Sequence, residues 1–101
     1  MQLDVEEILE NSGQAGQFLK LLANRNRLMV LCSLIDEELS VSELNERIPL
    51  SQSALSQHLA TLRNAGTVSI RREGQTIYYR IQDNRVKRML ATLADLFCEP
   101  K

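Results

Sequence analysis

The stretch of sequence that decides the fold is SQSALSQHLATLRNAG, residues 51–66. Ser51 is a favourable helix N-cap, and Gly66 lies just past Ala65, where the left-handed conformation that ends a helix favours glycine. At about 100° per residue, one side of this helix is apolar and the opposite side carries small, amide and hydroxyl side chains. The apolar side comprises Leu55, Leu59 and Leu62, and the opposite side comprises Ser53, Ser56, Gln57, Ala60 and Asn64. The sequence therefore predicts an amphipathic helix over residues 51–65 that is buried through its leucines.

The polar side of this helix is almost uncharged, whereas a merely solvated helix face more often carries glutamate and lysine. Serine and glutamine side chains bind base edges and phosphates, and small residues let a helix enter the major groove of DNA. We therefore predict that this helix contacts DNA, with plain solvation of the same face as the alternative. The predicted contacts in this region are Ser51, Gln52, Ser53, Ser56, Gln57, His58 and Arg63.

His58 lies at the edge of the apolar side. It either contacts a phosphate or is a boundary residue hydrogen-bonded to backbone, and both interpretations stay open. Because it is the only histidine in the chain, a histidine-based metal site or catalytic dyad is excluded. The chain also offers no nucleophile–base pair, no glycine-rich phosphate loop and no carboxylate pair in a polar setting, so we predict that it is not an enzyme.

Downstream of residue 66, the hydrophobic period changes from 3.6 to 2, which predicts a β-hairpin. Residues 68–72 and 77–81 alternate apolar and polar side chains, with a turn between them. Arg71, Arg72 and Gln75 would present cations and an amide on a thin ribbon that fits a minor groove or flanking phosphates. The alternative is an exposed hairpin that its arginines keep soluble.

Four helices are predicted upstream of residue 51, and one follows the hairpin. The first helix ends near residues 11–13, and the next three span about 14–23, from 24 or 25 to about 37–38, and 41–48. The helix after the hairpin runs from 84 to about 98. The third is assigned from apolar side chains at helical spacing, namely Leu28, Leu31, Cys32, Ile35 and Leu39. Ser42 is a favourable N-cap for the fourth helix, and Asp83 is one for the last.

The predicted order of elements is α-α-α-α-α-β-β-α. Two short helices at about the helix-turn-helix spacing are followed by a hairpin, which is the arrangement of a winged helix-turn-helix. We therefore predict a mainly α fold with a β-hairpin wing (α+β). A length of 101 residues is that of one domain, so the whole chain, residues 1–101, is expected to form a single DNA-binding domain.

The net charge of −1 hides an uneven distribution of charge. Residues 1–50 carry nine acidic and four basic side chains, whereas residues 51–101 carry four acidic and eight basic ones. Local fields, not the total charge, steer ligands toward a protein. From Ser51 to Arg80 the only acidic residue is Glu73, so this region is where a nucleic acid is expected to bind.

Neither a membrane span nor a signal peptide is predicted. The longest apolar run extends only from Leu28 to Cys32, far short of the roughly 20 residues that cross a bilayer. The chain opens with acidic residues, whereas a signal peptide opens with basic ones. We expect a cytoplasmic protein.

The first and last helices have apolar side chains that a monomer of this size leaves unburied. These residues are Val5, Ile8 and Leu9 on the first helix, and Met89, Leu93 and Phe97 on the last. A chain this short also has a marginal core of its own. We predict that the two helices pack across a two-fold axis in a homodimer.

Three motifs carry a resemblance to a known family. They are LSQSALSQHL at residues 50–59, LRNAG at 62–66 and RREGQTIYY at 71–79. Together they resemble the ArsR/SmtB family of winged-helix transcription regulators, and the resemblance covers nearly the whole chain. It implies a homodimer formed by the first and last helices, and operator binding that ends when an inducer is sensed. Two recognition helices related by a two-fold axis would bind an inverted repeat in double-stranded DNA.

That family is best known for metal sensing, and this sequence departs from the metal-binding pattern. The family's Cys-Val-Cys metal motif corresponds here to Ser40-Val41-Ser42, where hydroxyls replace thiolates. The last helix, where other members place Asp, His or Glu ligands, has cations at Arg85, Lys87 and Arg88. A divalent ion needs donors at such positions. We therefore expect neither a metal nor any other cofactor.

Cys32 and Cys98 are the only cysteines, and their placement resembles the subgroup of that family that contains HlyU, BigR and SqrR. The resemblance implies a dithiol pair that senses reactive sulfur species or oxidants. The residues themselves leave a second interpretation open, because free cysteine is often a small buried hydrophobe and Cys32 continues the apolar stripe of its helix. Cys98 would end the last helix, whose partial negative charge opposes thiolate formation.

The function predicted from these patterns is a DNA-binding repressor controlled by a switch that comprises Cys32 and Cys98. A HlyU-like activator or anti-silencer with the same fold remains an alternative, since the sign of regulation depends on the promoter. A metal-responsive repressor of the ArsR type is a further alternative. The serine and glutamine face and the arginine-rich hairpin favour DNA over a winged-helix module that binds only protein.

Overall fold

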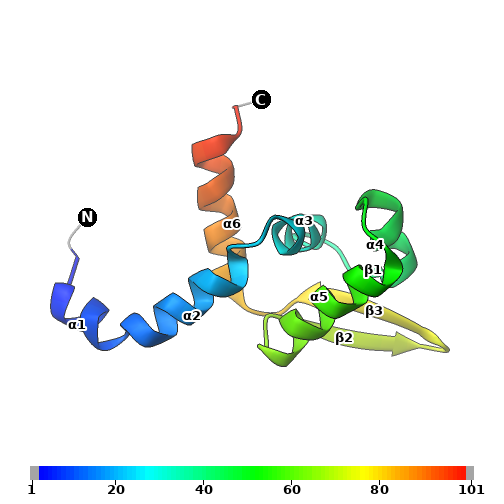
Figure 1. Ribbon diagram of the computed structural model, residues 1–101, viewed down its shortest axis with the longest axis horizontal. Coiled ribbons are helices and arrows are strands. Elements are labelled where there is room, and N and C mark those ends of the chain that lie inside the picture. Colours follow the sequence, from blue (N-terminus) through cyan, green and yellow to red (C-terminus); the bar gives the residue numbers. More distant parts are fainter. Residues whose placement is uncertain (1–2, 100–101) are drawn as a thin grey trace.

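The computed structural model describes residues 3–99, which form six helices and one three-stranded sheet. In chain order the elements are α1 (Val5–Glu10), α2 (Ser12–Leu22), α3 (Arg25–Ser33), β1 (Leu39–Ser40), α4 (Val41–Arg47), α5 (Gln52–Asn64), β2 (Val68–Glu73), β3 (Thr76–Ile81) and α6 (Asn84–Phe97). Figure 1 shows the β2–β3 hairpin extending to one side, while α1 and the end of α6 project away from the other elements. The predicted mainly α, winged helix-turn-helix fold is confirmed.

Helix α5 forms as its sequence predicts. The Ser51 side chain accepts a hydrogen bond from the Ala54 backbone N–H at 3.2 Å. The three leucines of its apolar side are at most 1% exposed. Gly66 follows the helix with a φ of +78°, in the left-handed region where a side chain would be strained.

The hairpin also agrees with the period-2 pattern. Strands β2 and β3 pair antiparallel from Val68 opposite Ile81 to Glu73 opposite Thr76. The turn between them has a positive φ of 62° at Gly74, which suits a two-residue type II′ turn with glycine at its first position.

Strand β1 was not predicted, and the sequence pattern had placed Leu39 on a helix. In the structure, Leu39 lies opposite Tyr79 and Ser40 lies opposite Tyr78, so β1 adds a short third strand beside β3. Leu39 is 2% exposed and belongs to the core, so its apolar side chain is buried from the sheet and not from a helix. A strand of two residues has no period of its own, which is why its sequence gave no sign of it.

Helix α3 ends at Ser33, earlier than the predicted end near residues 37–38. Three carboxylates follow in sequence, at Asp36, Glu37 and Glu38. Negative charge is unfavourable at a helix C-terminus, because the helix dipole places partial negative charge there. The carboxylates therefore oppose an extension of α3, even though apolar residues continue at helical spacing.

Helices α1 and α2 are separated by Asn11 alone, a narrower break than the predicted one over residues 11–13. The Asn11 side chain donates to the Glu7 carbonyl at 2.9 Å, and the Ser12 hydroxyl donates to the Leu9 carbonyl at 2.9 Å. These bonds satisfy carbonyls at the end of α1, while the Ala15 N–H already bonds to the Asn11 carbonyl at 3.0 Å. The turn is thus closed locally.

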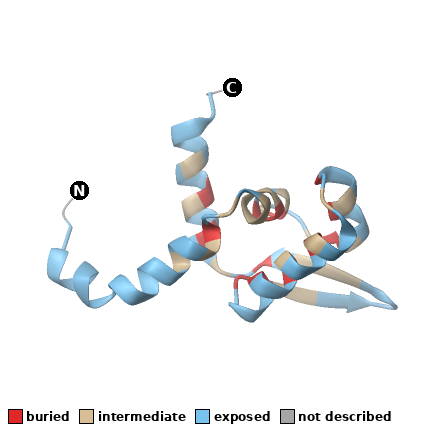
Figure 2. Ribbon diagram, in the orientation of Figure 1, coloured by how far each residue is buried: buried red, intermediate tan, exposed pale blue. Residues whose placement is uncertain are grey.

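The core lies between helices α2 to α6 and the sheet, and α1 has no buried residue. Its members are Leu22, Val30, Leu31, Leu34, Leu39, Leu44, Ile48, Leu55, Leu59, Leu62, Val68, Ile81, Val86 and Leu90. Figure 2 shows exposed residues all along α1 and near the end of α6. Over the described residues, no helix has both the length and the apolar character that a bilayer span requires.

Candidate nucleic-acid interface

The turn between α4 and α5 is held by one side chain that the sequence analysis did not single out. Asn45, on α4, donates from its amide to the Leu50 carbonyl at 2.8 Å. Ile48, between the two helices, is 3% exposed and belongs to the core. Together these contacts fix the start of α5 relative to α4. An asparagine in a short helix has no distinctive spacing, so only the folded geometry reveals this contact.

Helix α4 is capped by Ser40, and the prediction of Ser42 as its N-cap was wrong. The Ser40 hydroxyl accepts a hydrogen bond from the Glu43 N–H at 3.2 Å, and a Glu43 carboxylate oxygen accepts one from the Ser40 N–H at 3.0 Å. This reciprocal pair is a capping box. The bonds from the Ser40 backbone and side chain lower the pKa of Glu43. Ser40, which matches a metal-motif cysteine of the family, therefore serves as a helix cap here.

Replacing Ser40 with alanine should lower the free energy of unfolding by about 1 kcal/mol, because one cap hydrogen bond is lost. The difference between parent and variant should shrink in acid only by the share of the Glu43 pKa shift that the Ser40 hydroxyl contributes, because the backbone N–H of residue 40 remains in the variant. The folded-state pKa of Glu43 is depressed, so its contribution is present above the unfolded pKa and is lost as the pH falls through the folded pKa. Thermal unfolding at neutral and acidic pH measures both effects. Ser42→Ala is the control, and equal losses in the two variants would contradict the assignment of the cap.

The polar side of α5 is open to solvent. Ser51, Gln52, Ser53, Ser56, Gln57 and Arg63 are all exposed, and His58 is half-buried at the edge of the apolar side. The Ser51 and Ser53 hydroxyl oxygens lie 3.4 Å apart. The face thus presents hydroxyls and amides at the start of the helix and one cation, Arg63, near its end. Its leucine side is anchored in the core, so the polar face is held in a fixed orientation.

The hairpin presents its two adjacent arginines differently. Arg72 and Gln75 are exposed, and no ion pair of Arg72 occurs within residues 3–99. Arg71 pairs with Glu38 at 3.0 Å and with Glu73 at 3.1 Å. Because neighbouring residues of a strand point to opposite faces, the two arginines lie on different sides of the hairpin. Glu38 is remote in sequence, so this pair could not be predicted from a local pattern.

The two cysteines are both exposed and carry free thiols. Cys32 lies in the last turn of α3, and Cys98 follows α6, its backbone N–H bonded to the Ala94 carbonyl at 2.9 Å. Partial burial raises the pKa of the Cys32 thiol, and the charge of Cys98 raises it further. The Cys32 thiol is therefore more protonated at neutral pH than that of an ordinary cysteine.

The six residues predicted to form a dimer interface fall into two groups. Val5, Ile8, Leu9 and Phe97 are 63%, 48%, 66% and 81% exposed, respectively. Met89 and Leu93 are half-buried on α6, and Met89 packs against the core. Leu3, just before α1, and Leu96, on α6, add further exposed apolar surface. Among residues 3–99, no cluster of three or more His, Cys, Asp or Glu side chains could hold a metal ion.

Comparison with known proteins gives consistent matches. Residues 24–69 match the family model described as "Bacterial regulatory protein, arsR family". The chain is 48% identical over 97 residues to the transcriptional activator HlyU of Vibrio cholerae, covering 96% of this chain and 90% of that protein. It is 42% identical over 104 residues to the biofilm growth-associated repressor of Agrobacterium fabrum, covering 98% of this chain and 89% of that protein. A solved structure of reduced HlyU from Vibrio cholerae superposes with a TM-score of 0.86 at 50% identity, covering 93% of this chain and 99% of that one.

Proposed function

The chain belongs to the ArsR family of bacterial regulatory proteins, and we propose that it binds an inverted-repeat operator as a homodimer that a bridge between Cys32 and Cys98 releases. Its relatives are transcription regulators and not enzymes. The observation that carries the proposal is the exposed, nearly uncharged face of α5, backed by three buried leucines. A helix with such a face can enter the major groove.

In the proposed complex, α5 contacts base edges and the hairpin contacts phosphates or the adjacent minor groove. Gln57 lies at the middle of the exposed face and has an amide that can both donate to and accept from a base. Ser51, Gln52, Ser53, Ser56, His58 and Arg63 flank it as contacts to bases or backbone, and Arg72 and Gln75 make the contacts from the hairpin. Arg71, which the sequence also predicts as a contact, is paired with Glu38 and Glu73. Base contacts confer sequence preference, whereas phosphate contacts confer affinity.

Two variants separate these roles. Gln57→Ala should reduce discrimination between operator and scrambled DNA by about tenfold or more, because a base contact is lost. Arg72→Gln should weaken binding to both duplexes alike and reduce the magnitude of the slope of log K against log salt by about 1.8, because each dimer loses two phosphate contacts. Titrations of each variant with both duplexes over a range of salt give the two quantities. If Gln57→Ala discriminates as well as the parent does, α5 is not the recognition helix.

The proposed dimer rests on exposed apolar surface and on charge. Phe97 is 81% exposed and Leu9 is 66% exposed, and side chains of this size are favourable to bury. The two helices also differ in the sign of their charge: α1 has Glu6 and Glu7 in its first turn, whereas α6 has Arg85, Lys87 and Arg88 near its start. A partner's α6 would therefore offer α1 both apolar contact and charge complementarity.

The proposed switch is an oxidation of two thiols by a persulfide, RSSH. When the Cys32 and Cys98 thiols react with one RSSH, the products are a protein disulfide, RSH and H₂S. When they react with two RSSH, the products are a bridge of three sulfurs between the two residues, two RSH and one H₂S. The longer bridge suits thiols whose separation exceeds that of a simple disulfide. Burial raises the pKa of Cys32 most, and the charge of Cys98 raises it further, which supports a joint role for the two thiols. That Vibrio cholerae HlyU is described in a reduced form is in keeping with this proposal.

A second candidate is activation of transcription with the same mode of DNA binding. Similarity to the activator HlyU favours it, while similarity to a biofilm growth-associated repressor favours repression. The same dimer on DNA can have either effect, according to whether it displaces polymerase or a silencing protein. A promoter fusion to a reporter gene, measured with and without the protein, gives the sign directly.

A further inference from the structure

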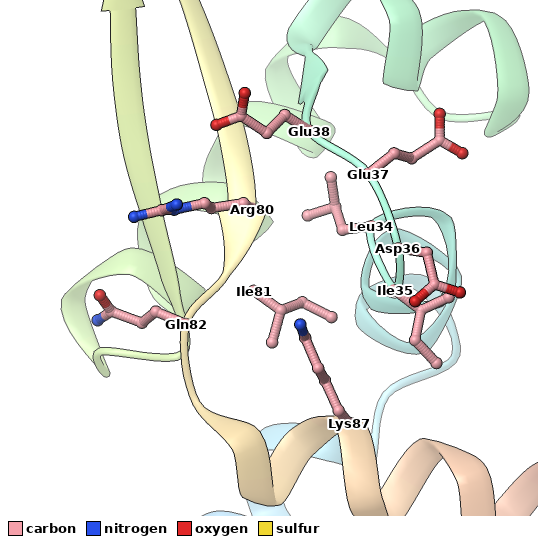
Figure 3. A pocket seen from close by; sticks show the side chains of 9 residues that line it. All are labelled: Leu34, Ile35, Asp36, Glu37, Glu38, Arg80, Ile81, Gln82 and Lys87. Carbon is pink, nitrogen blue, oxygen red and sulfur yellow. The ribbon is translucent and has the colours of Figure 1, made fainter.

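The segment between α3 and β1 contains three consecutive carboxylates, Asp36, Glu37 and Glu38, which we call the acidic segment. Figure 3 shows the side chains of Glu37 and Glu38 pointing to opposite sides of this segment. Glu37 forms an ion pair with a residue of α4, and Glu38 forms one with a residue of β2. One short segment therefore contacts both the helix-turn-helix and the hairpin.

Glu37 pairs with Arg47, the last residue of α4. Two hydrogen bonds join the guanidinium to the carboxylate, at 3.1 and 3.3 Å, so the pair has the bidentate geometry that gives arginine–carboxylate contacts their directionality. Arg47 is followed closely by Ser51, the N-cap of α5. This pair therefore links the end of α3 to the turn that positions the recognition helix.

Glu38 pairs with Arg71 on the hairpin. The Arg71 Nε donates to Glu38 at 3.0 Å and its Nη1 donates to Glu73 at 3.1 Å. The guanidinium carbon also lies 4.7 Å from the centre of the Tyr78 ring, and Tyr78 is the cross-strand partner of Arg71. Arg71 thus has two anionic partners and an aromatic one, and a DNA phosphate would have to displace or share them.

We propose that Arg71 is a positioning residue, and that Glu38 holds it so that the hairpin keeps a fixed orientation relative to α3. This inference rests on the proposed DNA-binding function and gives the two arginines different roles. Arg72 contacts phosphate, and Arg71 orients the strand on which Arg72 lies. Because α3 also carries Cys32, the acidic segment connects the thiol pair to both DNA-binding elements.

The first test needs no DNA. Glu38→Gln and Arg71→Gln should each increase hydrogen exchange of backbone amides near the hairpin tip by about two- to fivefold, the range expected when an exposed ion pair is lost. Arg72→Gln, the matched control, should leave these rates unchanged. NMR exchange measurements on the three folded variants give the comparison. If Glu38→Gln leaves the hairpin as protected as in the parent, Glu38 does not position it and the proposal fails.

The second test uses the duplex that the parent protein enriches from a random-sequence library. Glu38→Gln and Arg71→Gln should each weaken binding by about two- to fivefold with the salt slope unchanged. The double variant should bind no more weakly than Arg71→Gln alone. A flattened salt slope in Arg71→Gln, or tighter binding by Glu38→Gln, would make Arg71 a phosphate contact and overturn the proposal. If the parent enriches no duplex, the proposed function fails, while the exchange measurement still decides the role of Glu38.

Discussion

Treatment with a low-molecular-weight persulfide should release the parent protein from its operator, with a loss of affinity of about a hundredfold or more. A hundredfold change requires about 2.7 kcal/mol of difference between the bridged and DNA-bound geometries. A bridge from Cys32 to Cys98 would tie the end of α6 to the last turn of α3. That turn leads directly into the acidic segment, which pairs with Arg47 and Arg71, so a small displacement there reaches both DNA-binding elements.

Two single variants and one mass measurement make this prediction specific. Cys32→Ser and Cys98→Ser should each bind the operator as the untreated parent does, and neither should respond to persulfide. The mass of the treated parent should change by whole sulfur atoms less two hydrogens, and a thiol reductant should restore both mass and binding. Because burial raises the pKa of Cys32, its reaction should accelerate as the pH rises, since the thiolate is the nucleophile. If persulfide releases either single variant from the operator as readily as it releases the parent, the two cysteines do not form a switch and serve only in packing.

Phe97→Glu should convert the protein to a monomer at micromolar concentration and weaken binding to an inverted repeat by about a hundredfold or more. Phe97 is 81% exposed in the single chain, and an aromatic residue at the centre of an interface commonly accounts for about 2–4 kcal/mol of binding. A two-fold axis places the substitution in the interface twice. Loss of the dimer also removes the linkage between two half-site contacts.

Sedimentation and DNA titration measure the two effects on the same preparation. Leu9→Glu should behave like Phe97→Glu, because Leu9 is 66% exposed on α1. Ser42→Glu is the matched control: it introduces the same charge on α4, where Ser42 is exposed. If Phe97→Glu sediments as a dimer, the interface lies elsewhere on the chain.

The parts of the fold that were predictable from sequence have local signals. Helix α5 has its N-cap, its leucine spacing and its terminal glycine within one continuous stretch, and each signal depends only on near neighbours. The hairpin likewise has an alternating pattern and a glycine in its turn. The exposure of Phe97 and Leu9 was also predictable, because a chain this short cannot bury every apolar face.

The parts that were not predictable depend on residues distant in sequence. Leu39 fits a helical stripe, and its pairing with Tyr79 across the sheet is what assigns it to β1. The choice of Ser40 over Ser42 as N-cap is an exception, because only Ser40 has a glutamate three residues later, Glu43, and this capping-box spacing is a local signal. The pairing of Glu38 with Arg71 joins the acidic half of the chain to the basic half, and sequence alone gives no distance between them.

Selection of DNA from a random-sequence duplex library by the reduced parent protein tests the central claim most directly. The account predicts enrichment of an inverted repeat whose half-sites lie about one helical turn apart, or slightly more, as two α5 helices related by a two-fold axis require. Gln57→Ala, selected in parallel, should enrich this repeat poorly. The account is contradicted if the parent selects DNA with no sequence preference, or if Gln57→Ala enriches the same repeat as well as the parent does.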